Sequence, residues 1–280
     1  MNIGIVGLGL IGGSLAKALR QKTDHHLLGF DRDQAVLDRA LAEGVVAEAL
    51  TDDALPRCDI LLLAVRPQAI IQWLTDHAPR LSRHTVVLDC AGTKAKVCAA
   101  GQALARQWGF TFVGGHPMAG TEKMGYAASR PNLFDGASML VVPGEDYPPR
   151  VRTMVEELCR EIGFGGVKYT TAQEHDRTIA YTSQLAHVVS SAYIKSPTAQ
   201  NYVGFSAGSF KDMTRVAFLN EPMWTELFLE NRENLLRELR ELQGHLSDYI
   251  QALEANDWDA LEGLLREGRT LKVLSDNREV

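Results

Sequence analysis

The sequence is poor in cysteine and carries no excess of positive charge. Its four cysteines, Cys58, Cys90, Cys98 and Cys159, form no CxxC pair and have no histidines at metal-ligand spacing, which predicts reduced packing residues and no metal site. A formal net charge of −6 gives no general attraction to nucleic acid or to an anionic membrane. This charge leaves room only for a local basic pocket that would bind an acidic metabolite.

Targeting and membrane-spanning patterns are also missing. The chain begins with a strand-like segment, residues 2–6, instead of a basic region followed by an apolar stretch and a cleavage site. No apolar run approaches the roughly 18–20 residues that cross a bilayer. We therefore expect a cytoplasmic protein with neither membrane nor nucleic-acid partners.

What the sequence does contain is enough apolar material for a large core. Of its 280 residues, 45% are apolar and 23% charged, and a chain of this length usually forms two domains. Short apolar runs alternate with helical stretches up to about residue 145, which predicts an α/β fold with a Rossmann-type parallel sheet covered by helices on both faces. The expected strands are residues 2–6, 27–31, 59–65, 85–89, 111–114 and 138–143.

The pattern changes near residue 170. A helix over 149–162 and a short strand-like GVKY come first, and Thr171 with Glu174 then fits a helix capping box. We predict a nucleotide-binding domain over residues 1–170 and an all-α domain over 171–280.

One long helix is expected in the second domain, beginning near Asn220 and Pro222 and continuing to about Leu253. Roughly 30 residues at a rise of ~1.5 Å would extend ~45 Å, more than one small domain needs to cover. A second copy of the chain packed on these helices, giving a homodimer, explains such a length, and a long helix packed only within its own chain is the alternative.

The string GLGLIG follows the first expected strand and opens a helix. Gly7, Gly9 and Gly12 have the GxGxxG spacing, and Leu10 and Ile11 begin the helix. In such a turn the first glycine allows the tight bend, the second lets the backbone approach a pyrophosphate, and the third lets helix and strand pack closely. The string predicts a dinucleotide-binding site.

The end of the second expected strand bears on the identity of the dinucleotide. Asp31 would accept hydrogen bonds from the adenosine ribose and repel a 2′-phosphate, which favours NAD over NADP. Arg32 could instead pair with that phosphate if its side chain turns inward. We predict NAD, with NADP as the alternative.

His116 follows a buried strand and two glycines, at the edge of the sheet where open α/β folds bind ligands. An imidazole beside a nicotinamide could take the proton of a substrate hydroxyl while the carbon gives up a hydride. A histidine in such a loop is equally well a hydrogen-bonded structural residue.

The whole string around His116, HPMAGTE, closely resembles the prephenate and arogenate dehydrogenases of tyrosine biosynthesis. Three further segments match that family in order: DCAGTK at 89–94, SQLAH at 183–187 and GSFKDMTR at 208–215. The resemblance also covers the glycine string, an NLF at 132–134 and the helical second domain. It implies oxidative decarboxylation of prephenate to 4-hydroxyphenylpyruvate, with hydride transfer to NAD⁺.

The resemblance also implies roles for individual residues. His116 would contact the ring hydroxyl as the catalytic base, and Arg215 would bind a substrate carboxylate with its guanidinium. His187 would face the substrate side chain. Thr93 stands where the family has a serine and would hydrogen-bond His116 or the substrate.

Other positions are less certain matches. Gln184 replaces a family histidine at the substrate site, and it can still donate and accept hydrogen bonds but cannot titrate. Glu122 is placed with the substrate-binding residues, and together with Asp212 it could pair with Arg215 or Lys123 to gate the pocket.

Several functions stay open from the sequence. Arogenate differs from prephenate by an amino group in place of a keto group, and we favour prephenate because a neutral or charged His187 could donate to a ketone or carboxylate. An arogenate enzyme would more naturally place a carboxylate near the ammonium. The remote alternatives are a β-hydroxyacid dehydrogenase, which would need a lysine and asparagine pair that the second half lacks, and a non-catalytic NAD-sensing regulator.

Overall fold

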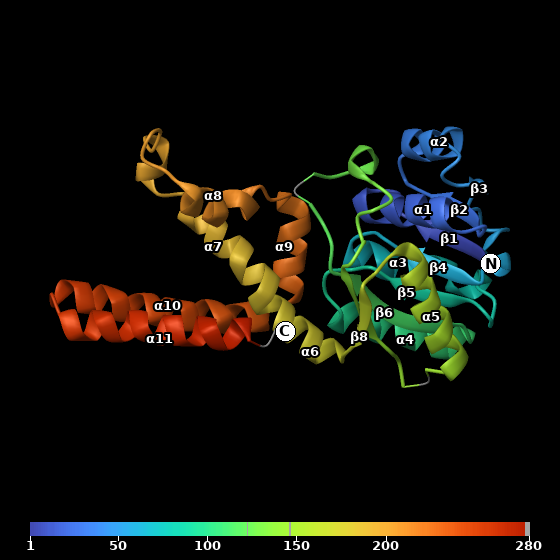
Figure 1. The fold of residues 1–280 in the computed structure, drawn as a ribbon. Helices are drawn as coiled ribbons and strands as arrows, with labels where there is room; N and C mark the ends of the chain where they lie inside the picture. Colours follow the sequence, from blue (N-terminus) through green and yellow to red (C-terminus); the bar gives the residue numbers. More distant parts are fainter. Residues whose placement is uncertain (122, 146, 278–280) are drawn as a thin grey trace. The chain divides into compact units, whose positions relative to one another are not determined.

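The protein is described by a computed structural model that covers residues 1–121, 123–145 and 147–277. Its contacts group the chain into two compact units, Met1–Asn231 and Arg232–Val280. The first unit therefore contains the whole sheet together with the helices from residue 171 to residue 231. Figure 1 shows the ribbon, coloured along the sequence.

A sheet of eight strands in the order β3-β2-β1-β4-β5-β6-β7-β8 forms the centre of the first unit. The strands are β1 (Asn2–Val6), β2 (His26–Phe30), β3 (Glu48–Ala49), β4 (Ile60–Leu63), β5 (Val86–Asp89), β6 (Thr111–Pro117), β7 (Ser138–Val142) and β8 (Gly166–Tyr169). The helices that pack on the sheet are α1 (Leu10–Lys22), α2 (Gln34–Ala42), α3 (Pro67–His77), α4 (Ala95–Trp108) and α5 (Pro149–Ile162).

Both faces of the sheet are covered, as the continuous apolar runs predict. In β4 the alternation is plain: Ile60 and Leu62 pack in the cluster that contains α1, α2 and α5, whereas Leu61 and Leu63 pack in the cluster that contains α3 and α4. All four cysteines are free and three of them are buried, which confirms that they are packing residues. The Rossmann-type fold class is confirmed.

The parallel order that the sequence predicts is interrupted at one edge of the sheet. Strands β1 to β6 are parallel, but β7 runs antiparallel to β6, with His116 opposite Leu140, and β8 is parallel to β7. A parallel return needs a crossover connection, usually a helix, whereas the described residues between β6 and β7 form no helix longer than the short turn Tyr126–Ala128. The two-residue strand β3 was not predicted, because so short a run has no readable periodicity.

The rest of the first unit is helical and begins as the capping pattern predicts. The Thr171 hydroxyl accepts a hydrogen bond from the amide of Glu174, at 3.1 Å, and starts α6 (Ala172–Ile179). The chain continues through a π-helical turn, Ala180–Leu185, into α7 (Ala186–Tyr193). The helices α8 (Gly208–Thr214) and α9 (Glu221–Glu230) complete the unit.

The single long helix expected from about residue 220 to 253 is interrupted at Asn231. The chain forms α9 and then α10 (Arg232–Glu254), with Asn231 between them at φ −107° and ψ 26°. Asn231 is buried, and its side-chain amide donates to the backbone oxygen of Asp176 and to Oε1 of Gln184. These hydrogen bonds hold the Asn231 side chain in the interior at the residue where α9 ends.

The second unit is a pair of helices. The helices α10 and α11 (Trp258–Asp276) pack side by side, joined by a turn in which Asn256 has φ 51° (Figure 1). The Asp257 carboxylate caps α11 by accepting from the amide of Ala260, at 3.0 Å. Within the described ranges, no helix combines the length and the apolar character needed to span a bilayer.

Candidate active site

Each glycine of the turn between β1 and α1 has its own structural reason. Gly7 has φ +87°, and a Cβ there would lie 2.4 Å from Val65 Cγ1. A Cβ on Gly12 would lie 1.8 Å from the Gly7 oxygen, so only glycine lets the helix pack on the turn. At Gly9 a Cβ would meet nothing within 4 Å. The open space at Gly9 is what a pyrophosphate approaching the backbone requires.

The first turn of α1 presents donors to this space. The helix begins at Leu10, with Gly9 as its N-cap and no side-chain capping hydrogen bond, so the first amides, including that of Ile11, have no acceptor within the helix. Helix N-terminal amides of this kind bind phosphate. The residues of the turn therefore fit a dinucleotide.

Asp31 lies at the end of β2, beside the glycine turn. Its Oδ2 accepts from the amide of Leu8 at 2.8 Å, and its Oδ1 accepts from the amide of Asp33 at 2.9 Å. Each carboxylate oxygen keeps a second lone pair for ribose hydroxyls. Arg32 is exposed.

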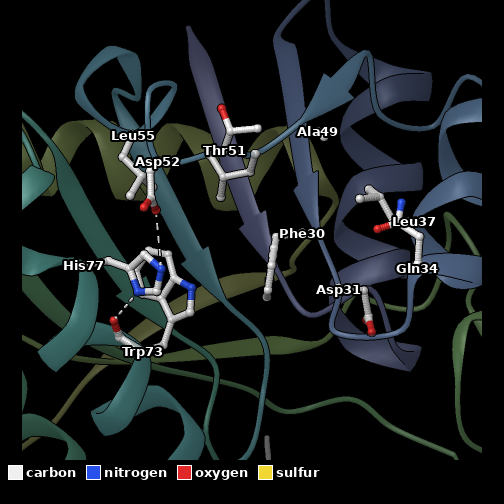
Figure 2. A pocket seen from close by; sticks show the side chains of 11 residues that line it. Phe30, Asp31, Gln34, Leu37, Ala49, Thr51, Asp52, Leu55, Trp73 and His77 are labelled. Atoms are coloured by element: carbon white, nitrogen blue, oxygen red, sulfur yellow. Dashed lines mark hydrogen bonds and ion pairs between the residues drawn. The ribbon is translucent and has the colours of Figure 1, made fainter.

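A cavity of about 330 Å³ opens beside Asp31 (Figure 2). Its wall contains Phe30 and the stacked rings of Trp73 and His77, whose centroids lie 4.4 Å apart. Asp52 is in the same part of the wall, with its Oδ1 3.6 Å from Nε2 of His77. An aromatic wall next to the Asp31 carboxylate fits the adenosine end of a dinucleotide.

His116 lies near the carboxyl end of β6 and contacts a second histidine. Its Nδ1 lies 2.9 Å from Nε2 of His175 on α6, and the Nδ1 of His175 lies 2.8 Å from Oδ1 of Asp176. Burial, His175 and the positive charge of Lys94 hold the pKa of His116 well below its usual value near 6.5. At neutral pH the His116 imidazole is therefore uncharged and able to accept a proton.

A buried ion pair supports the strand that carries His116. Lys94 and Asp89 are paired with both side chains fully buried, and Lys94 Nζ also donates to the backbone oxygen of Gly115 at 2.7 Å. Asp89 Oδ1 accepts from the amide of Gly115 at 3.1 Å. The pair holds both polar groups of the residue before His116, and so fixes the backbone from which the imidazole projects.

The hydroxyl of Thr93 donates to Glu230 and not to His116, and the alternative that the family resemblance implies, a hydrogen bond to the substrate, stays a prediction. The accepting atom is Oε2 of Glu230, at 2.7 Å, because a carboxylate is the stronger acceptor. The other oxygen of Glu230, Oε1, is buried without a hydrogen-bond partner. Burial raises the pKa of Glu230, while the Thr93 hydrogen bond opposes that rise.

Gln184, which the sequence places with the substrate-binding residues, has both ends of its side-chain amide hydrogen-bonded within the protein. It is buried, its Nε2 donates to the backbone oxygen of Leu227 at 3.2 Å, and its Oε1 accepts from Asn231 at 2.8 Å. The two ends of the amide therefore connect the π-helical turn to the end of α9 by hydrogen bonds.

His187 and Arg215 lie close together on α7 and the turn after α8. Arg215 is exposed, and its charge contributes to the lowered pKa of His187, although burial is the larger cause. The His187 ring packs on Trp224 with centroids 3.9 Å apart. Its Nδ1 lies 2.8 Å from the Ser183 backbone oxygen, which can only accept, so Nδ1 carries the proton and Nε2 of the neutral ring is an acceptor.

That tautomer removes part of the argument that favoured prephenate. A neutral His187 with Nδ1 donating to Ser183 cannot also donate to a substrate ketone; only the protonated ring can, and its lowered pKa makes that form scarcer. Glu122 lies outside the described residues. For Asp212, no pairing with Arg215 or Lys123 is among the ion pairs of the described part of the chain.

The sequence did not single out His175, Asp176, Lys94 or Glu230 as residues of this site. Lys94 was visible only as the last letter of DCAGTK, and His175 and Asp176 follow the capping residues of α6. A histidine and an aspartate in the first turns of a helix that follows the sheet can indicate a site. The residue that His175 contacts, His116, is 59 positions away and could not be identified from the sequence.

Known proteins resemble this chain over nearly its whole length. Residues 15–168 match the family model of the prephenate dehydrogenase nucleotide-binding domain, and residues 171–267 match that of the prephenate dehydrogenase dimerization domain. A cyclohexadienyl dehydrogenase of Zymomonas mobilis is 30% identical over 97% of this chain and 95% of its own length.

Two solved structures share the fold. The arogenate dehydrogenase of Synechocystis is 30% identical, with 100% of both chains covered and a TM-score of 0.81. The prephenate dehydrogenase of A. aeolicus, in complex with hydroxyphenyl propionate and NAD⁺, is 27% identical over 98% of this chain and 97% of its own, with a TM-score of 0.86. The chain belongs to the prephenate dehydrogenase family, and the family's nucleotide-binding and dimerization domains follow one another in it.

Proposed function

We propose that the protein oxidatively decarboxylates prephenate to 4-hydroxyphenylpyruvate and uses NAD⁺ as hydride acceptor. The observation that carries the proposal is the place of His116: a neutral imidazole near the carboxyl end of β6, in the same unit as a glycine turn that fits a dinucleotide. When bound, the nicotinamide supplies the acceptor for the hydride that leaves the substrate ring.

His116 performs both proton transfers in this proposal. Its Nε2 takes the proton of the ring hydroxyl as the C–H bond on the same carbon gives up its hydride and a ring ketone forms. Loss of carbon dioxide from the opposite ring carbon then makes the ring aromatic and leaves a phenolate oxygen. His116 returns its proton to that oxygen, so the reaction consumes and releases no net proton.

The charged end of the substrate is assigned to Arg215 and His187. Prephenate carries two carboxylates, and the exposed guanidinium of Arg215 can bind one of them with two hydrogen bonds. His187 lies near enough to Arg215 for the guanidinium charge to lower the pKa of its imidazole, after the larger effect of burial. Both would act on the substrate side chain, away from the reacting ring carbon.

The preference for NAD⁺ rests on Asp31. A 2′-phosphate would place two negative charges beside a carboxylate whose position is fixed by two backbone amides. The Arg32 side chain is exposed and would have to rotate towards the glycine turn to reach such a phosphate. NADP therefore stays the second choice.

Arogenate is the second candidate substrate, and two observations favour it. The His187 tautomer offers a lone pair at Nε2, which accepts from an ammonium but not from a ketone. Glu230 also provides a carboxylate with an unpartnered oxygen next to Thr93. Among the relatives, one is a cyclohexadienyl dehydrogenase and another an arogenate dehydrogenase.

Steady-state formation of NADH or NADPH with each of prephenate and arogenate tests the proposal, repeated on His116→Asn. We expect the NAD⁺ and prephenate pair to give the highest kcat/KM and the variant to lose about 100- to 10,000-fold in kcat. Turnover with arogenate alone would replace the substrate. Absence of turnover with every pair would leave a non-catalytic NAD-binding role.

We further propose that the protein forms a homodimer through the helices α10 and α11. The helices α10 and α11 expose apolar side chains that one helix pair cannot bury: Leu246, Ile250, Leu253, Leu265, Leu271 and Leu274. Light scattering should give twice the chain mass of 30.8 kDa, and the double substitution of Ile250→Glu with Leu253→Glu should reduce it to the mass of one chain.

The cytoplasmic location stays a prediction.

A further inference from the structure

Three side chains from two elements form a continuous hydrogen-bonded row behind the proposed catalytic base. His116 on β6 contacts His175 on α6, and His175 contacts Asp176, with donor–acceptor distances of 2.9 and 2.8 Å. The His175 side chain is fully buried and that of Asp176 is 5% exposed, so water does not compete for these bonds. The two imidazole rings lie with centroids 5.1 Å apart at an angle of 54°.

Asp176 fixes the direction of the row. Its Oδ1 accepts from the amide of Lys94 at 2.7 Å, and its Oδ2 accepts from the amide of Ala95 at 2.9 Å, at the start of α4. Two backbone donors and the positive end of the α4 dipole favour the ionised carboxylate, which has no proton to donate. The contact with His175 therefore needs a proton on the Nδ1 of that ring.

The remaining protons follow from this one. A neutral His175 with its proton on Nδ1 has a lone pair on Nε2, so the bond to His116 needs the proton on the Nδ1 of His116. The only lone pair left in the His116 ring is then on Nε2. That is the atom which must be unprotonated to accept a proton from a substrate hydroxyl.

We propose that His175 is a positioning residue which, held by Asp176, keeps His116 in the Nδ1-protonated tautomer and thereby makes Nε2 the base. The proposal rests on the function proposed above, and adds to it the residue that selects the reactive nitrogen. After His116 takes a proton, its Nδ1–H still donates to His175, and the negative charge of Asp176 lies behind. Lys94, paired with Asp89, is the charged group that opposes this imidazolium.

Two isosteric substitutions separate the two bonds of His175. His175→Gln places an amide oxygen near the Nε2 position, keeps an acceptor for His116 and gives up the Asp176 contact. His175→Asn keeps a donor near the Nδ1 position for Asp176 and loses the His116 contact. We expect His175→Asn to lower kcat by about 100-fold with KM changed by less than about threefold, and His175→Gln to stay within about tenfold of the parent kcat.

Nitrogen-15 NMR of the histidine side chains reads the tautomer directly in the unsubstituted enzyme, with His116 assigned by its loss in His116→Asn. We expect a protonated Nδ1 and an unprotonated Nε2 in His116, preserved in His175→Gln and lost in His175→Asn. A proton on His116 Nε2 in the parent protein, or equal kcat losses in the two variants, would overturn the proposal. The NMR result needs no substrate, so it stands apart from any failure to find turnover.

Discussion

The cofactor turn and the site around His116 are built in opposite ways. The turn consists of backbone amides, glycines and one partly exposed carboxylate, all within the first 33 residues. The site around His116 uses buried polar and charged side chains, and two of its contacts, His116 with His175 and Thr93 with Glu230, join residues 59 and 137 positions apart. A local string specifies the first site, whereas only the complete fold assembles the second.

Substitution of Lys94 should give the largest loss of stability, because the charges in the His116 site are buried and water cannot solvate them. Lys94→Met leaves Asp89 buried and unpaired, and we expect the free energy of unfolding to fall by about 3–5 kcal/mol. Urea denaturation followed by circular dichroism measures this loss.

Two controls sharpen that result. The double variant Lys94→Met with Asp89→Asn removes the uncompensated charge and should recover part of the lost stability. Arg57→Met breaks an exposed ion pair with Glu48 on β3, and should leave the urea midpoint unchanged. Equal losses in Lys94→Met and Arg57→Met would remove the distinction between the two regions.

Within the cofactor turn, two glycine substitutions should differ sharply. Gly12→Ala forces a Cβ to within 1.8 Å of the Gly7 oxygen, and since that oxygen belongs to the backbone, we expect a cost of about 1–3 kcal/mol or more in folding stability. Gly9→Ala meets no atom within 4 Å and should fold normally.

Cofactor binding completes this comparison. Gly9→Ala should weaken NAD⁺ binding about tenfold, as its methyl group occupies the space left for the pyrophosphate. Thermal unfolding and isothermal titration with NAD⁺ measure the two properties separately. If Gly9→Ala bound NAD⁺ as the parent does, the dinucleotide would not approach the backbone at this glycine.

Much of the first unit could be predicted because its signals are local. The apolar runs specify strands buried on both faces, and the spacing of Gly7, Gly9 and Gly12 predicts the tight turn between β1 and α1. The reversal of β7 was missed since strand patterns carry no direction. The contacts of Gln184 and Thr93 could not be predicted, because their partners, Asn231 and Glu230, lie more than 45 positions away in the sequence.

The charge at Asp31 should produce a smaller but specific change. Asp31→Ser removes the repulsion of a 2′-phosphate and two acceptors for ribose hydroxyls, so the kcat/KM ratio of NAD⁺ to NADP⁺ should fall about tenfold or more. The unfolding midpoint should fall slightly, because the amides of Leu8 and Asp33 lose their acceptor. An unchanged ratio would mean that Asp31 does not face the ribose.

The smallest expected effect is the dependence of stability on pH that His116 causes. Its pKa in the folded protein lies well below 6.5, so the unfolded chain binds the proton more readily, and the stabilisation by the neutral ring is full above pH 6.5 and decreases as the pH falls below it. The melting temperature of the parent protein should therefore decline from pH 7 to pH 5 more steeply than that of His116→Asn. His187, whose pKa is also lowered, contributes a slope of the same sign that both proteins keep. Gly9→Ala, altered only in the cofactor turn, should decline in parallel with the parent; parallel curves for His116→Asn as well would mean that the imidazole is not held neutral by its surroundings.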